Sequence, residues 1–146
     1  MVEDINLLRE KLLRCLKNFR KSIDFFEKAK EEKIIKIMPK VDFINIMCDS
    51  LIKSFELSDI LFWEYLQKYL EYQGFPPNIY GPSPVIRTAC KANLIFEDDA
   101  GGLLEMVEDR NELAQDYYEE LVEVIIPKVP QYYELMKKYA DKLVLD

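Results

Sequence analysis

One arginine of the sequence, Arg110, lies in an apolar setting where a charge is costly. Its neighbours at helical spacing are Leu103, Met106, Val107, Leu113, Ala114 and Tyr117. None of them is acidic, and a guanidinium on an apolar face must be paired and hydrogen-bonded to offset its loss of water. Arg110 therefore needs an acid from another helix, from a partner subunit or from a ligand.

Spacing leaves two interpretations of Arg110 open. The first is a structural buried ion pair, for which Glu56 is a candidate because it follows Phe55 in a segment that is apolar on two sides. The second is a functional arginine in a cleft, where the guanidinium binds a phosphate through two nitrogens. Asn111 beside it suits either a nucleotide contact or a helix end.

The composition excludes the enzyme classes that depend on histidine, because the chain contains none. Ser-His-Asp and Cys-His catalysis and His-ligated zinc are therefore ruled out. The cysteines Cys15, Cys48 and Cys90 are odd in number and lack metal-ligand spacing, so we interpret them as buried, reduced thiols. Glu108 and Asp109 are adjacent and would point to different sides of a helix. We expect neither a metal nor a cofactor.

The charge balance disfavours a general nucleic-acid binder. The net charge is −7 and the isoelectric point is near 4.8, whereas nucleic-acid binding needs a basic face. RNA or a nucleotide stays open as a ligand but is not favoured, and a basic protein partner suits the overall field better. The acidic, amphipathic N-terminus is unlike a signal peptide, and no apolar run approaches a membrane span. We expect a cytoplasmic protein without a membrane segment.

Hydrophobic periodicity predicts an all-α protein that forms a single domain over residues 1–146. Only 4 of 146 residues are glycine, and apolar residues recur at three-four spacing in most of the chain. The predicted helices span about 4–32, 41–73, 84–94, 99–115 and 118–143. Pro127 and Pro130 should break the last one near 126–130. The result is a mostly up-and-down bundle of about four to five helices.

Capping residues mark the predicted helix ends. Asp4 is a plausible N-cap of the first helix, and Gly74 should end the second in a left-handed conformation. Ser83 is expected to cap the third helix with Pro84 at its first position. The acids of the segment 96–102 are expected at the start of the fourth.

Aromatic residues occur in pairs along several predicted helices. Phe62 and Trp63 are compatible with a ligand-stacking platform, but core or interface packing is the more common role. The doublets Tyr117-Tyr118 and Tyr132-Tyr133 should each place one ring inside the protein and one towards the rim. Packing is the default function of these rings.

Three segments resemble the nucleotidyltransferase substrate-binding family, whose members are small helical proteins of the HEPN class encoded beside a minimal nucleotidyltransferase. They are FELSDILFWEYLQKYL (55–70), PSPVIRTACKANLI (82–95) and LLEMVEDRNELAQDYYEE (103–120). The resemblance covers about residues 51–143. The positions that match the family pattern are Phe55, Glu56, Trp63, Val85, Ile86, Arg87, Leu94, Ile95, Met106, Glu108, Asp109, Arg110 and Asn111.

The resemblance implies an HEPN-like helical homodimer that pairs with a nucleotidyltransferase, as the toxin half of a toxin–antitoxin module. Such toxins are metal-independent RNases with an Arg, four residues, then His, and two copies of this motif meet across the dimer. The nucleotidyltransferase of related modules adds AMP to a tyrosine two residues beyond that histidine. In this chain the histidine position is Gln115, and Tyr117 stands at the AMP-acceptor position.

The departure at Gln115 favours one of the function hypotheses over the others. Glutamine forms hydrogen bonds but does not exchange a proton near neutral pH. We therefore expect a homodimeric binding partner of a minimal nucleotidyltransferase, with Tyr117 as a candidate AMP acceptor and without RNase activity. One alternative is an atypical RNase built on Arg110, Asn111 and Tyr117, and another is a plain helical adaptor. Arg110 is expected at the dimer seam, in a cleft or interface that also includes Glu56, Trp63 and Asp109.

Overall fold

The computed structural model describes residues 1–31, 40–113 and 118–145, and all of its regular elements are helical. The prediction of an all-α bundle is therefore confirmed. The elements are α1 (Val2–Glu31), α2 (Lys40–Tyr72), α3 (Pro82–Lys91), α4 (Glu97–Glu112), α5 (Tyr118–Ile125), the 3-10 turn η1 (Ile126–Lys128) and α6 (Val129–Lys142). None of the described helices is both long and apolar enough to cross a membrane.

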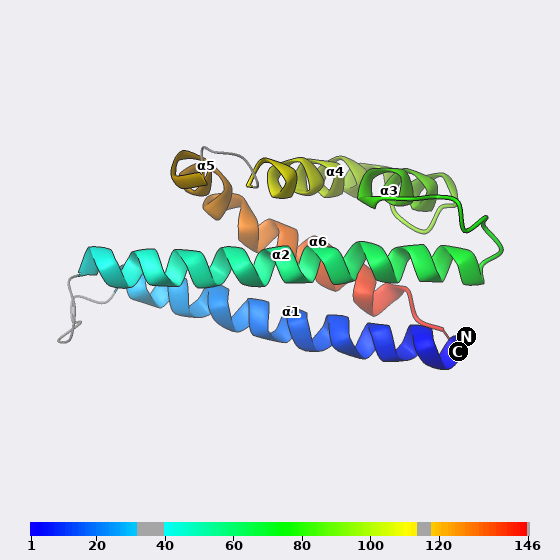
Figure 1. The fold of residues 1–146 in the computed structure, drawn as a ribbon, viewed down its shortest axis with the longest axis horizontal. Helices are drawn as coiled ribbons and strands as arrows, with labels where there is room; N and C mark the ends of the chain where they lie inside the picture. The colour runs from blue at the N-terminus through cyan, green and yellow to red at the C-terminus, as the bar shows by residue number, and fades with distance from the viewer. Residues whose placement is uncertain (32–39, 114–117, 146) are drawn as a thin grey trace.

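The long helix α2 lies at the centre of the bundle. Helix α1 runs antiparallel to it on one side, and α3 and α4 lie along the other side (Figure 1). Helix α6 crosses behind α2 and contacts α1, α2 and α4. This path brings the two ends of the chain close together at one end of the bundle (Figure 1).

The core follows the apolar stripes of the helices. The stripe of α1 is buried along its length and consists of Ile5, Leu12, Leu16, Phe19, Ile23 and Phe26. It meets a cluster of rings in which Phe55 stacks on Tyr132 at 5.6 Å between centroids and Tyr133 meets Phe19 edge-on at 5.8 Å. Both Tyr132 and Tyr133 are buried. The prediction that one ring of this doublet faces the rim is wrong, because α6 is packed against three other helices.

Two helices end in a Schellman motif. After α2, Gly74 has φ 98°, and the amide of Phe75 donates to the carbonyl of Leu70 at 3.0 Å. The predicted left-handed end at Gly74 is confirmed. After α3, Asn93 takes the equivalent position with φ 61°, and the amide of Leu94 donates to the carbonyl of Ala89 at 2.9 Å. Asparagine tolerates this conformation better than most residues.

Other helix boundaries differ from the expected ones by a few residues. Helix α3 begins at Pro82, and Gly81 is its N-cap without a side-chain cap hydrogen bond, so the predicted cap at Ser83 is wrong. The conformation explains this, because Gly81 has φ 94°, which suits glycine far better than serine. Helix α1 already begins at Val2, which places Asp4 in its first turn rather than at the cap.

The prolines break the last helical region where expected. Helix α5 ends at Ile125, η1 carries Pro127, and α6 resumes at Val129 with Pro130 in its first turn. Each proline lacks the amide that a continuous helix would need.

The cysteines differ from prediction in their burial. Cys15, Cys48 and Cys90 are all partly exposed. Cys15 and Cys90 are thiols outside any disulfide, and the hydroxyl of Ser58 donates to the sulfur of Cys15 at 3.6 Å. The expected burial is therefore wrong, because these positions lie at the edges of the apolar stripes rather than at their centres.

Candidate functional site

Arg110 lies in the last turn of α4 and reaches across to the middle of α2. Its Nε is 3.9 Å from Oδ2 of Asp59, whose side chain is only 2% exposed, whereas that of Arg110 is 32% exposed. The prediction that Glu56 pairs with Arg110 is therefore wrong. The acid that pairs with Arg110 is Asp59, one turn further along α2. Glu56 itself is only partly buried. The guanidinium of Arg110 therefore contacts a buried carboxylate on one side and is partly exposed to solvent on the other.

The carboxyl of Asp59 is in an unfavourable environment for a charge. Its pKa is raised from 3.8 to about 7, chiefly because the carboxyl is buried; the positive charge of Arg110 lowers this pKa in part and the negative charge of Glu56 adds to the rise. At 3.9 Å the pair is an ion pair without a hydrogen bond, and neither Oδ1 of Asp59 nor Nε of Arg110 has a hydrogen-bond partner. Burying such groups unsatisfied costs free energy, and perturbed carboxyls of this kind gather at functional sites.

Asp109, next to Arg110 in the chain, has a structural role. Its carboxylate is buried, accepts a hydrogen bond from the hydroxyl of Tyr132, and lies 3.3 Å from Nζ of Lys128. Lys128 also reaches Glu105 at 2.9 Å, and the pKa of this lysine is raised by its hydrogen bonds to the two carboxylates. These contacts join the end of α4 to η1 and α6. They hold the backbone from which Arg110 extends towards Asp59.

The structure brings together some of the predicted site residues. Arg110 and Glu56 both lie beside Asp59, whereas Asn111 is exposed at the end of α4. Gln115 and Tyr117 lie outside the described residues. In the part of the chain that is described, no group of three Cys, Asp or Glu side chains is arranged to hold a metal.

Asp59 is the residue that sequence reasoning missed. Its neighbours at helical spacing include Phe55, Phe62 and Trp63, so it is an acid in the same kind of apolar setting that drew attention to Arg110. Applied to acids, that criterion marks Asp59 as a further candidate partner of Arg110, but it does not choose between Asp59 and Glu56, which lie one turn apart on α2.

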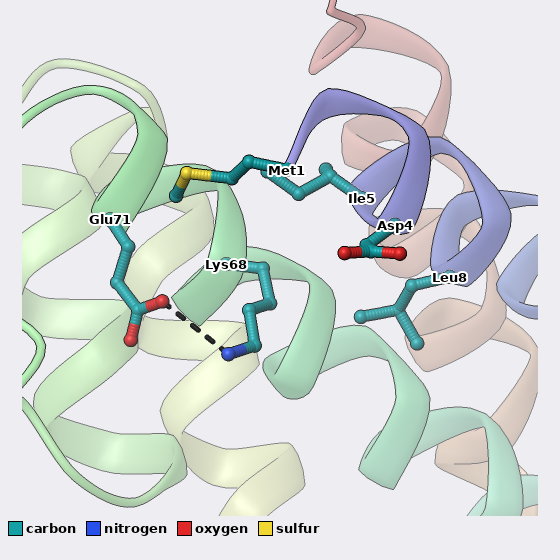
Figure 2. Close-up of a pocket in the computed structure, with 6 residues that line it drawn as sticks. All are labelled: Met1, Asp4, Ile5, Leu8, Lys68 and Glu71. Atoms are coloured by element: carbon teal, nitrogen blue, oxygen red, sulfur yellow. Dashed lines mark hydrogen bonds and ion pairs between the residues drawn. The ribbon is translucent and has the colours of Figure 1, made fainter.

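A groove lies elsewhere on the bundle, between the first turns of α1, the last turns of α2 and the loop 75–81. It consists of two adjoining cavities of about 200 and 310 Å³, which share Leu8, Lys68 and Glu71. Figure 2 shows the first cavity, where Asp4 and Leu8 of α1 face Lys68 and Glu71 of α2, and Lys68 pairs with Glu71 at 3.5 Å. The second cavity is also lined by Trp63, Glu64, Gln67, Pro77 and Tyr80.

The fold and the Arg110–Asp59 pair define a small helical bundle with a charged site between two of its helices. Residues 14–144 match the sequence model of the family described as "Nucleotidyltransferase substrate binding protein like". The chain belongs to this family.

A solved structure of a bacterial protein has a similar fold. This crystal structure, of a protein from Thermus thermophilus, is similar with a TM-score of 0.62 and 27% sequence identity over 86% of this chain and 98% of the other. Comparison with curated proteins found no match.

Proposed function

We propose that this protein is the binding partner of a minimal nucleotidyltransferase and acts as an HEPN-like homodimer, the homologue of a toxin in a toxin–antitoxin module. The match to the nucleotidyltransferase substrate-binding family over residues 14–144 carries the proposal. Tyr117 is the proposed acceptor of AMP from the nucleotidyltransferase. The protein acts in the cytoplasm as a binding component and needs neither a metal nor a cofactor.

The exposed apolar residues of α2 support the homodimer. Ile46 and Leu57 are 49% exposed each, and they are separated by about three helical turns, which places them on the same face. Ser50 and Lys53 lie between them on this face, so the two side chains would be the apolar contacts of an otherwise polar interface.

Leu57 and Asp59 are two residues apart, so their side chains point to nearly opposite sides of α2, and the face of Ile46 and Leu57 is not the one that meets Arg110. The proposed place of Arg110 at a dimer seam rests on the family resemblance and on its side chain being 32% exposed.

Intact mass after co-expression tests the proposed partnership. With the adjacently encoded nucleotidyltransferase and ATP, the wild-type protein should co-purify with that enzyme and gain mass in whole AMP units. Tyr117→Phe should lose this gain because it lacks the acceptor hydroxyl. Tyr72→Phe is the matched control, since Tyr72 is 42% exposed, lines neither cavity of the groove and should leave the gain unchanged.

Two outcomes would contradict part or all of the proposal. An unchanged mass together with a stable complex would remove Tyr117 as acceptor and leave a binding subunit. An unchanged mass without a complex would contradict the proposed function and leave the plain helical adaptor, for which Arg110→Ala would alter stability alone.

The carboxyl of Asp59 favours an RNase as the second candidate function. A group with a pKa of about 7 beside Arg110 can exchange a proton near neutral pH, which Gln115 cannot do. Its side chain is only 2% exposed, however, and a general base must come within hydrogen-bond reach of the substrate hydroxyl. The burial of Asp59 therefore leaves the binding role as the leading proposal.

An RNA-cleavage assay separates the two functions. The purified wild-type protein should leave single-stranded RNA intact near pH 7, whereas Gln115→His supplies the missing proton-exchanging group and is the variant expected to gain cleavage. Cleavage by the wild type that disappears in both Arg110→Ala and Asp59→Asn would overturn this preference and establish an atypical RNase.

A further inference from the structure

The groove between α1, α2 and the loop 75–81 has an excess of negative charge. Three carboxylates line it, those of Asp4, Glu64 and Glu71, against the single lysine side chain of Lys68. Lys68 already pairs with Glu71 at 3.5 Å. Within the described residues, Asp4 and Glu64 have no ion pair, so their charges are available to a ligand.

Aromatic and apolar surface accompanies these charges. Trp63 precedes Glu64 on α2 and is partly exposed, and Tyr80 of the loop is 78% exposed. Leu8 and Pro77 add apolar surface to the same cavity. A carboxylate next to aromatic rings is a favourable site for a guanidinium or ammonium group, which gains both an ion pair and a cation–π contact.

We propose that this groove binds a basic segment of a partner protein, with an arginine or lysine at Glu64 beside the rings of Trp63 and Tyr80. Apolar residues of the segment pack against Leu8 and Pro77. The acidic lining opposes nucleic acid and anionic lipid surfaces, because both would bring phosphates to it. A second copy of this chain is a poor occupant, since its net charge of −7 repels the same lining.

The inference goes beyond the proposed function, because the groove is built from α1, α2 and a loop, whereas Arg110 extends from α4. It does not require that the partner be a nucleotidyltransferase. A failed AMP-transfer experiment would therefore leave it standing, and a failed peptide experiment would leave the AMP-transfer proposal standing.

Trp63 makes the inference directly measurable, because it is the only tryptophan of the protein. The probe is a synthetic amphipathic peptide of leucine, arginine and lysine without tryptophan, and its counterpart carries glutamate at every basic position. The basic peptide should cause a saturable change in the emission of Trp63, as its indole loses water. The acidic peptide should cause none.

Variants distinguish docking in the groove from general charge attraction. Glu64→Lys should weaken binding of the basic peptide about tenfold or more, since it reverses the charge at the contact. Glu27→Lys makes the same change in net charge at an exposed position near the other end of α1 and should change affinity by less than about twofold, because salt screens distant charges. Tyr80→Ser should weaken binding without changing charge, and its exposure predicts that the variant folds normally.

Three results would overturn the inference. The first is no saturable emission change with the basic peptide. The second is equal weakening by Glu64→Lys and Glu27→Lys, which indicates non-specific attraction. The third is an emission change that depends on protein concentration without peptide, which indicates that a second copy fills the groove. Far-UV circular dichroism of each variant verifies that the comparison is between folded proteins.

Discussion

Replacing Asp59 with asparagine is expected to stabilise the protein by about 4 kcal/mol near pH 8 and by less than about 1 kcal/mol near pH 4. Burial raises the pKa of this carboxyl from 3.8 to about 7. Each unit of difference between the folded and unfolded states corresponds to about 1.4 kcal/mol. Asparagine keeps the shape of the side chain but never bears the charge.

The sign of the effect follows from proton binding. Between about pH 4 and pH 7, the unfolded state has released the proton of Asp59 while the folded state still holds it. The stability of the wild-type protein should therefore fall as the pH rises through this window and then stay at the lower level. The Asp59→Asn variant lacks this decline. Arg110 tolerates the loss of its partner because its side chain is 32% exposed and keeps part of its hydration.

Urea unfolding at a series of pH values measures this difference. Asp98→Asn is the matched control, because Asp98 is an exposed acid in the first turn of α4 and its loss should cost less than about 1 kcal/mol through the helix dipole. An Asp59→Asn variant that is less stable than the wild type near pH 8 would contradict the prediction. It would mean that the ion pair with Arg110 outweighs the cost of burying the carboxylate.

Replacing Phe55 with alanine is expected to destabilise the protein by about 3–5 kcal/mol. Its ring is fully buried, stacks on Tyr132 at 5.6 Å, and lies 6.1 Å from Phe19. Removing it leaves a cavity where α1, α2 and α6 meet. For a chain of this length the melting temperature should fall by about 10 °C.

Thermal unfolding of Phe55→Ala and Phe25→Ala provides the test. Phe25 is on α1 but 60% exposed, so its replacement should cost less than about 1 kcal/mol. Equal losses in the two variants would contradict the described core. The result also bears on the site, because Phe55 supports Tyr132, whose hydroxyl holds Asp109 next to Arg110.

Sequence patterns predicted the helices well because the features that form or end a helix involve residues that are close together in the sequence. The apolar stripe of α1 is a property of consecutive turns, and its members from Ile5 to Phe26 are buried except for Leu8, which is partly buried. Gly74 ends α2 because of its own backbone freedom, and Pro127 interrupts the last helical region because it lacks an amide. None of these features depends on how the helices pack against one another.

The site could be predicted only in part because its partners come from different helices. Spacing showed that Arg110 needs an acid, but the choice of Asp59 over Glu56 depends on how α4 is placed against α2. The burial of Tyr133 has the same origin, since α6 is enclosed by three helices. Helical periodicity describes one helix at a time and cannot rank acids that lie one turn apart on another.

Because α6 crosses behind α2, the core of the protein cannot be completed until this last helix has been synthesised. Tyr132, Met136 and Tyr139 of α6 complete the core against the two long helices. Two further contacts join sequence-distant elements: the hydroxyl of Tyr65 donates to the carbonyl of Leu143 at 2.5 Å, and Nε of Arg9 donates to that of Ala140 at 3.0 Å. On the ribosome, the α1–α2 hairpin emerges first and must keep its apolar face uncovered until α6 has been made, as long-range contacts delay folding. The nascent hairpin is therefore expected to expose apolar surface that the complete fold covers.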